Sequence, residues 1–208
     1  MVLILSILLI LVILGISEWG WRKGWLRGEL GRKFIHITVG TFVAFWPFFI
    51  SWNQIRLLSL AFLVAVIIAH YFNIFHAIDS VQRPTYGQLF FAAVVGLLTF
   101  ATHSKGIYAA ALLQMSLADG FAALVGTYLG RDSKYFLLGH TKSVAGTAAF
   151  LATSLVILIG YSMFSTLGLP IIVVIWAALA ATALENLLAF GLDNLLIPLF
   201  VAAVLVSF

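Results

Sequence analysis

A single aspartate interrupts the otherwise apolar segment SLADGFAALVGTYLGR at residues 116–131. Small residues follow Asp119 at spacings of three, four, seven and 11 residues: Ala122, Ala123, Gly126 and Gly130. Residues at these spacings lie on one face of a helix. Small side chains let a second helix approach closely. We therefore expect Asp119 to face protein or a polar cavity, and a carboxylate inside an apolar segment indicates a functional site.

A second polar stripe with the same spacing lies in ELGRKFIHITVG. It consists of Glu29, Arg32, Lys33, His36 and Gly40. These residues again fall on one helix face. Basic side chains neutralise phosphoryl oxygens, so this stripe favours contact with a phosphate group.

The segment LLGHTKSVAGTAAF predicts the start of another helix. Lys142 is followed there by Ser143, Gly146 and Thr147. The first turn of a helix has free backbone N–H groups, which suit a phosphate group. We expect an anion-binding helix start at this point.

Three further polar residues lie in ALENLLAFGLDNLLIPLF: Glu185, Asp193 and Asn194. Carboxylate and amide oxygens hold Mg²⁺, while Lys and Arg neutralise phosphates. The four clusters together indicate phosphate chemistry on a nucleotide, in which positioning and charge carry most of the catalysis. The sequence has no Walker A loop and no Rossmann fingerprint, so it does not support a soluble nucleotide-binding fold.

The elements that must position these residues are membrane helices. Of the 208 residues 63% are hydrophobic and 9% are charged, and the mean hydropathy is +1.16. A soluble domain could not cover so much apolar surface. We expect an all-α integral membrane protein, one polytopic helical bundle over residues 1–208 with seven or eight transmembrane helices of roughly 20 residues each. The predicted segments are 2–17, 34–51, 55–73, 88–102, 106–130, 143–163, 170–190 and 193–207.

The first segment, VLILSILLILVILGIS, lacks the basic start and the small-residue cleavage site of a secretory signal peptide. We interpret residues 1–28 as an N-terminal anchor helix followed by a basic loop. The chain has no cysteine, which excludes disulfides and thiolate metal sites. The net charge of +4 reports orientation in a membrane protein, so no nucleic-acid partner is expected.

The basic residues indicate that orientation. The predicted loops 18–33, 74–87 and 131–142 hold nine of the 11 Lys and Arg residues, and only Arg56 and Lys105 lie on the other side. By the positive-inside rule the three loops face the cytoplasm and both termini lie outside. The acidic residues lie on or near the cytoplasmic side as well, which the rule does not explain. We therefore expect the four polar clusters to converge on a cytoplasmic site.

In their order along the chain, these motifs resemble the polyprenol kinase family of integral membrane enzymes, which includes dolichol, phytol and farnesol kinases and a CTP-dependent diacylglycerol kinase. The resemblance covers residues 29–200, a kinase-like core, and rests on ELGRKFIHITVG, DSVQRPTYGQLFF, ADGFAALVGTYLGR, KSVAGTAAF and LENLLAFGLDNLLIPL. It implies transfer of the γ-phosphate of CTP, or sometimes UTP, to the hydroxyl of a long isoprenoid or glyceride alcohol. The family's motif residues correspond to Asp119, Gly120, Ala122 and Gly126, to Lys142, Ser143 and Gly146, to Arg32, Lys33 and His36, and to Asp193, Asn194 and Pro198. Arg131 stands where many relatives have lysine.

The residues and the resemblance together predict roles at the site. We expect catalytic roles for Asp119, Lys142, His36 and Glu185. We expect nucleotide contacts from Arg32, Lys33, Gly120, Gly126, Gly130, Arg131, Ser143 and Gly146. We expect the cofactor, Mg²⁺, to be held by Asp119, Asp193 and Asn194. The acceptor would come from the bilayer, and the sequence leaves open phytol, geranylgeraniol, farnesol, polyprenol, dolichol and diacylglycerol, the choice between CTP and UTP, and the oligomeric state.

Other functions fit parts of the pattern. CTP:phosphatidate cytidylyltransferases, which make CDP-lipids, share the intramembrane aspartate and the lysine element, but they end in a D-R-x-D metal site, and here Asn194 follows Asp193. A small ion or solute transporter would also carry intramembrane acids, though spread through the membrane depth. Structural alternatives are an Asp119 ion paired with Lys142 or Arg32, a Glu185 bonded to a neighbouring helix, and a His36 that caps a helix or binds a backbone carbonyl.

Overall fold

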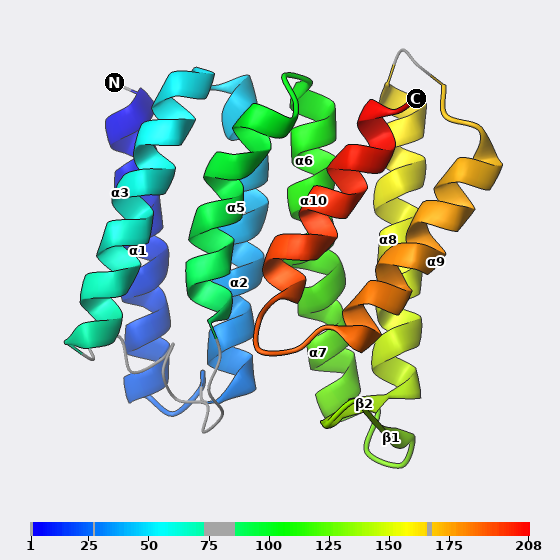
Figure 1. Cartoon of the computed structure of the whole chain (residues 1–208). Coiled ribbons are helices and arrows are strands. Elements are labelled where there is room, and N and C mark those ends of the chain that lie inside the picture. The colour runs from blue at the N-terminus through cyan, green and yellow to red at the C-terminus, as the bar shows by residue number, and fades with distance from the viewer. Residues whose placement is uncertain (1, 27, 73–85, 166–167) are drawn as a thin grey trace.

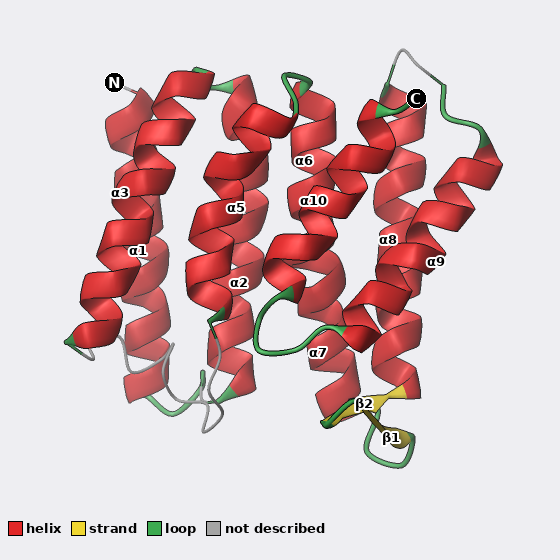
Figure 2. Cartoon of the chain, viewed as in Figure 1, coloured by secondary structure: helices red, strands yellow, loops and turns green. Residues whose placement is uncertain are grey.

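The structure is a computed structural model that describes residues 2–26, 28–72, 86–165 and 168–208. Its described part is helical apart from one small hairpin (Figures 1 and 2). The helices are α1 (Val2–Arg22), α2 (Glu29–Ala44), α3 (Trp52–Tyr71), α5 (Gly87–Ala101), α6 (Lys105–Leu113), α7 (Asp119–Tyr128), α8 (Val144–Phe164), α9 (Ile171–Leu187) and α10 (Asp193–Val206). The strands are β1 (Lys134–Leu137) and β2 (His140–Ser143). The predicted all-α bundle is confirmed, with the hairpin as an addition that the sequence did not predict.

Helix length and hydropathy identify a membrane protein. In the described residues, three helical segments are long and apolar enough to cross a membrane: Val2–Arg22, Lys105–Tyr128 and Val144–Phe164. The second of these combines α6, a π-helical turn (Gln114–Ala118) and α7. Other apolar helices are shorter. Each predicted segment coincides with one helix or with the combined α6–α7 helix, while the number of membrane crossings stays a prediction.

Helix α2 begins and ends earlier than predicted. The expected span was 34–51, whereas the helix runs over Glu29–Ala44. Its first turn is stabilised by the Arg32 guanidinium, which donates to the Glu29 carboxylate at 3.1 and 2.7 Å, an i,i+3 pair. A short 3₁₀ helix, Trp46–Phe48, follows its end and contains Pro47, which has no N–H to continue the α-helical hydrogen bonds. The polar stripe of the sequence is therefore part of the helix and not of a preceding loop.

The two ends of the bundle carry different parts of the chain. Figure 1 shows both termini at one end, and the start of α2, the end of α7 and the hairpin at the opposite end. Packing of α3 on α5, α7 on α8, α5 on α10 and α8 on α9 joins the helices around one buried apolar cluster. The polar segments thus gather away from the termini. Most of the predicted loop 74–87, including Asp79 and Arg83, lies outside the described residues, and the membrane orientation stays a prediction.

The predicted loop at 131–142 folds into the hairpin, in which β1 and β2 pair antiparallel. Between the strands, Leu138 and Gly139 have positive φ angles of 46° and 87°, as a two-residue type I′ turn requires. Strand β2 ends at Ser143, directly before α8. The hairpin therefore fixes Lys142 beside the start of that helix.

Candidate active site

A polar cavity of about 600 Å³ lies at the hairpin end of the bundle, and we call it the polar basin. Its walls come from the start of α2, from α7, from the hairpin, from the start of α8 and from the α9–α10 turn. Ten of the predicted site residues line it: Arg32, Lys33, Asp119, Gly126, Lys142, Ser143, Gly146, Glu185, Asp193 and Asn194. The four polar clusters of the sequence therefore meet in one cavity.

Two side chains of α2 hold the Asp119 carboxylate. Its Oδ2 forms an ion pair with the Lys33 ammonium, and His36 Nε2 lies 3.2 Å from the same oxygen. The Lys33 side chain is 2% exposed and that of Asp119 is 8% exposed, so the pair is shielded from water. In the described residues neither Lys142 nor Arg32, the partners considered from the sequence, pairs with Asp119.

His36 meets two acceptors at one ring nitrogen. Its Nε2 lies 2.8 Å from the Met115 carbonyl oxygen and 3.2 Å from Asp119 Oδ2. A carbonyl and a carboxylate oxygen accept hydrogen bonds, so Nε2 carries a proton and donates it. Among the described residues no hydrogen bond involves Nδ1, which leaves that nitrogen available to a ligand. The backbone contact was one of the structural alternatives for His36, and it coexists with the contact to Asp119.

A π-helical turn, Gln114–Ala118, directly precedes Asp119. The Asp119 N–H bonds to the Gln114 carbonyl, five residues back, and does not close an α-turn on Met115. The Met115 carbonyl instead receives the His36 imidazole. Such turns interrupt α-helices frequently at functional sites, and here the turn brings a backbone acceptor and a carboxylate to the same imidazole.

Glycines set the spacing of the helices around Asp119. A Cβ at Gly120 would overlap Ile37 of α2, and a Cβ at Gly146 would lie 2.8 Å from the Ala122 carbonyl oxygen. A Cβ at Gly126 would lie 3.5 Å from the Gly146 Cα. The small-residue stripe of α7 therefore meets α8 backbone to backbone, which confirms the close approach predicted from its spacing.

Three of the predicted nucleotide contacts lie away from the polar basin. Gly120 packs on α2, Gly130 packs on Ser143, and Arg131 is exposed. None of the three is among the residues that line the basin. Ser143 caps α8, because its Oγ accepts the Gly146 N–H at 3.1 Å. One N–H of that helix start is therefore used within the protein.

Lys142 and Glu185 form a further ion pair of the polar basin. Lys142 Nζ donates to the Glu185 carboxylate and, at 2.8 Å, to the Glu185 backbone carbonyl. The lysine side chain is half-buried and the glutamate side chain is buried. Glu185 therefore fixes the position of the Lys142 ammonium.

Sequence reasoning missed a polar group beside this pair. The Tyr135 hydroxyl lies 2.7 Å from Thr147 Oγ1 and also bonds to Asn186 Oδ1. Thr147 donates to the same Oδ1 at 2.9 Å. These contacts tie β1 to α8 and α9 and so hold the hairpin at the basin. Of these residues the sequence analysis named Thr147, whereas it missed Tyr135 and Asn186.

Asp193 and Asn194 offer oxygens that have no partner among the described residues. Asn194 Nδ2 donates to the Gly87 carbonyl at 2.9 Å, whereas its buried Oδ1 has no hydrogen-bond partner in the described residues. The half-buried Asp193 carboxylate likewise has no hydrogen-bond or ion-pair partner among them. A buried acceptor without a donor indicates a place for a ligand.

These oxygens fit Mg²⁺. No group of three or more His, Cys, Asp or Glu side chains in the described part of the chain is arranged to hold a metal ion. Mg²⁺, however, is usually bound through one or two carboxylates together with substrate phosphates. Asp119, Asp193 and Asn194 all line the polar basin and provide such oxygens.

The charges that line the polar basin balance one another. The four basic side chains are Arg32, Lys33, Lys134 and Lys142, and the four acidic ones are Glu29, Asp119, Glu185 and Asp193. A polyanion would therefore find no net positive charge among them, and its repulsion by the carboxylates is offset only when a cation accompanies it.

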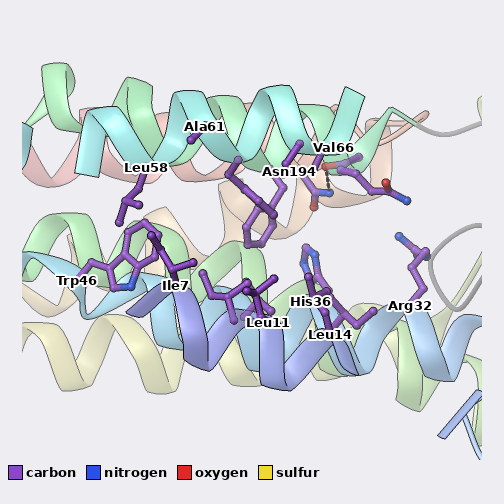
Figure 3. A pocket seen from close by; sticks show the side chains of 18 residues that line it. Ile7, Leu11, Leu14, Arg32, His36, Trp46, Leu58, Ala61, Val66 and Asn194 are labelled. Carbon is purple, nitrogen blue, oxygen red and sulfur yellow. Dashed lines mark hydrogen bonds between the residues drawn. The ribbon is translucent and has the colours of Figure 1, made fainter. Parts of the chain in front are cut away.

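A second cavity, of about 330 Å³, adjoins the polar basin, and we call it the apolar cavity. Its walls belong to α1, α2, α3, α5 and the first turn of α10. Figure 3 shows Arg32, His36 and Asn194 toward one end and Trp46 and Leu58 toward the other. Arg32 and Asn194 line both cavities. The His36 ring and the Asn194 amide point toward one another at this junction (Figure 3).

Fold and site together define a helical membrane protein whose site joins a polar and an apolar compartment. The chain is 34% identical over 180 residues to the phytol kinase of Synechocystis sp., an alignment that covers 82% of this chain and 76% of that protein. It is 29% identical over 158 residues to probable phytol kinase 2, chloroplastic, of Oryza sativa, which covers 67% of this chain and 50% of that protein. No family model and no solved structure matches the chain.

The chain belongs to the polyprenol kinase family, as the Synechocystis alignment shows. It is a phosphotransferase with an alcohol as acceptor. The resemblance inferred from the ordered motifs is thereby confirmed, and the transporter and cytidylyltransferase interpretations lose their main support.

Proposed function

We propose that this protein transfers the γ-phosphate of CTP to the hydroxyl of a membrane isoprenoid alcohol, at a site on the cytoplasmic face. The observation that carries the proposal is the junction of the polar basin with the apolar cavity at Arg32, His36 and Asn194. A lipid-alcohol kinase must bring a charged donor to the end of a hydrophobic acceptor, and each compartment suits one of them. The choice of CTP, with UTP as the alternative donor, follows from the resemblance to polyprenol kinases.

On the donor side, the triphosphate lies in the polar basin against Arg32, Lys33 and Lys142. Lys33 and Lys142 are each paired with a carboxylate in the protein, so their ammonium groups are placed before the nucleotide arrives. Such preorganisation is the main source of catalysis in phosphoryl transfer.

The balanced charge of the polar basin supports a nucleotide that binds together with Mg²⁺. Asp119, Asp193 and Asn194 would hold the ion, because their oxygens face the basin. When bound, Mg²⁺ neutralises charge on the phosphate oxygens.

On the acceptor side, the hydroxyl lies at the junction between His36 and Asn194. Its oxygen forms a bond to the γ-phosphorus while the bond from that phosphorus to the bridging oxygen breaks, and CDP leaves. The hydroxyl proton passes to His36 Nδ1, since Nε2 already carries a proton that it donates to Met115 and Asp119. Glu185 lines only the polar basin, so His36 is the better placed of the two predicted bases. The contribution of the base is modest in a loose transition state.

Transfer of label from γ-labelled CTP to a panel of lipid alcohols tests the reaction. Label in the lipid is expected. Label found only in pyrophosphate would instead identify a cytidylyltransferase and overturn the proposal. Arg131→Ala serves as a matched control for Lys142→Ala, because only Lys142 lines the polar basin, and the control variant should keep near-normal transfer.

Nucleotide binding measured without turnover tests the metal. We expect CTP with Mg²⁺ to raise the unfolding temperature of the purified protein, and CTP with a chelator to raise it little. An equal rise in both conditions would contradict a metal-dependent site.

A further inference from the structure

The apolar cavity is longer than a hydroxyl group requires. From His36 at the junction it follows α2 to its end at Ala44 and reaches Trp46 in the next turn, ten residues after His36 (Figure 3). At 1.5 Å per helical residue this distance is about 15 Å. An extended chain advances roughly 3.5 Å for every three bonds, so about 13 bonds fit, the main chain of an isoprenoid with about three units.

The far end of the apolar cavity is closed by buried side chains. Trp46 is 3% exposed and Leu58 is 8% exposed. Between this end and the junction, α3 contributes the small side chains of Ala61 and Ala65 to the wall. The depth of the cavity is therefore set by large residues at its end, while alanines keep its middle wide.

Helix α1 supplies the wall opposite α3. Its residues Ile7, Leu11 and Leu14 line the apolar cavity, although the resemblance to polyprenol kinases begins only at α2. Helix α1 packs chiefly against α2, and most of its apolar side chains are exposed. A lipid from the bilayer can therefore reach the cavity beside a helix that is held from one side.

We propose that the apolar cavity holds the tail of the alcohol and measures its length, with Trp46 and Leu58 as the residues that limit it. This inference rests on the kinase function proposed above. An extended farnesol chain fits with its hydroxyl at His36, whereas geranylgeraniol and phytol, which are one unit longer, fit in a bent conformation. The cavity cannot enclose the tails of dolichol and long polyprenols, which are several times longer than the distance from His36 to Trp46.

A thiol-protection experiment tests binding without turnover. The chain has no cysteine, so Ala61→Cys and Leu60→Cys each introduce a single thiol. Leu60 is the matched control, because it precedes Ala61 on α3 and does not line the apolar cavity. We expect phytol to slow alkylation of the thiol at 61 by about 10-fold or more and to leave the thiol at 60 unchanged, whereas dolichol protects neither. A tenfold change corresponds to the binding difference of a well-fitted apolar group.

The dependence of kcat/KM on the chain length of the alcohol tests whether the apolar cavity selects alcohols by length. Ala61→Phe fills the deep half of the apolar cavity, and Leu60→Phe adds the same ring to the outer face. We expect Ala61→Phe to lower kcat/KM for phytol about 10-fold relative to farnesol and Leu60→Phe to keep the ratio.

The two experiments separate the inference from the proposed function. If phytol protects the thiol at 61 but is not phosphorylated, the proposed kinase function is refuted and the proposed tail site is supported. If phytol is phosphorylated but protects both thiols equally, and Ala61→Phe leaves the chain-length profile unchanged, the tail site is refuted and the kinase function is supported. Efficient phosphorylation of dolichol would also overturn the length limit.

Discussion

Replacing Asp119 with asparagine tests two roles of its ion pair with Lys33, one in the stability of the fold and one in catalysis. The substitution keeps the shape of the side chain and removes the charge that compensates the Lys33 ammonium. The Lys33 side chain is only 2% exposed. Removing one partner of a buried ion pair typically costs about 3–5 kcal/mol, because the other charge is left without compensation. Asparagine still accepts a hydrogen bond from Lys33, so we expect a loss near the lower limit, about 3 kcal/mol.

The same variant should lose catalysis for a different reason. Without its anion the side chain would no longer hold the proposed Mg²⁺ or orient His36 and Lys33, and we expect the rate of phosphate transfer to fall about 10²-fold or more, roughly 2.7 kcal/mol of transition-state stabilisation. A stability loss alone would lower the amount of folded enzyme. Rates must therefore be expressed per folded molecule, from the unfolding curve of the same preparation.

The double variant Lys33→Met, Asp119→Asn distinguishes the two effects. It removes both charges, and replacement of a whole buried pair by uncharged groups is often neutral. We expect the unfolding temperature to recover most of the loss, while transfer of label from CTP stays low. Recovery of both properties, or near-normal transfer by Asp119→Asn across a magnesium titration, would make Asp119 a structural ion and refute the reasoning.

Three further outcomes are expected. Lys142→Ala should raise KM for CTP and lower kcat together, about 10-fold in kcat/KM, since in the proposed reaction its charge contacts phosphate before and during transfer; steady-state kinetics check this. Gly146→Ala places a Cβ 2.8 Å from the Ala122 carbonyl oxygen, which should separate α7 from α8 and cost about 1–3 kcal/mol in an unfolding experiment. Single cysteines at 132–141 should react with a membrane-impermeant reagent only from the cytoplasmic side and those at 52–54 only from outside, and external labelling of 132–141 would overturn the predicted orientation.

The helices were predictable because apolar composition and spacing are local signals. Every predicted segment coincides with a helix, and the error was largest at α2, which was expected at 34–51 and runs over Glu29–Ala44. Hydropathy places a boundary where charge begins. The helix continues through that charge because Arg32 and Glu29 pair within its first turn, an interaction that a hydropathy average does not register.

The composition of the site was predictable, but the pairing within it was not. Stripes at helical spacing identified the faces that carry Lys33 and Asp119. Which lysine meets which carboxylate depends on how two helices cross, and the structure pairs Asp119 with Lys33, while Lys142 binds Glu185. The hairpin was missed for a related reason, since Leu138 is not a residue expected at positive φ.

The contact between His36 and Asp119 depends on a feature without a sequence signal. An uninterrupted α-helix would use the Met115 carbonyl for the Asp119 N–H, whereas the π-helical turn bonds that N–H to Gln114. Met115 is then a partner for Nε2, and the proton fixed on Nε2 leaves Nδ1 toward the junction with the apolar cavity. No Gly or Pro marks residues 113–118. The His36 tautomer that could receive a hydroxyl proton thus follows from one extra residue in a helical turn. This turn packs against α2 at Gly40, where an added Cβ would collide with Ser116.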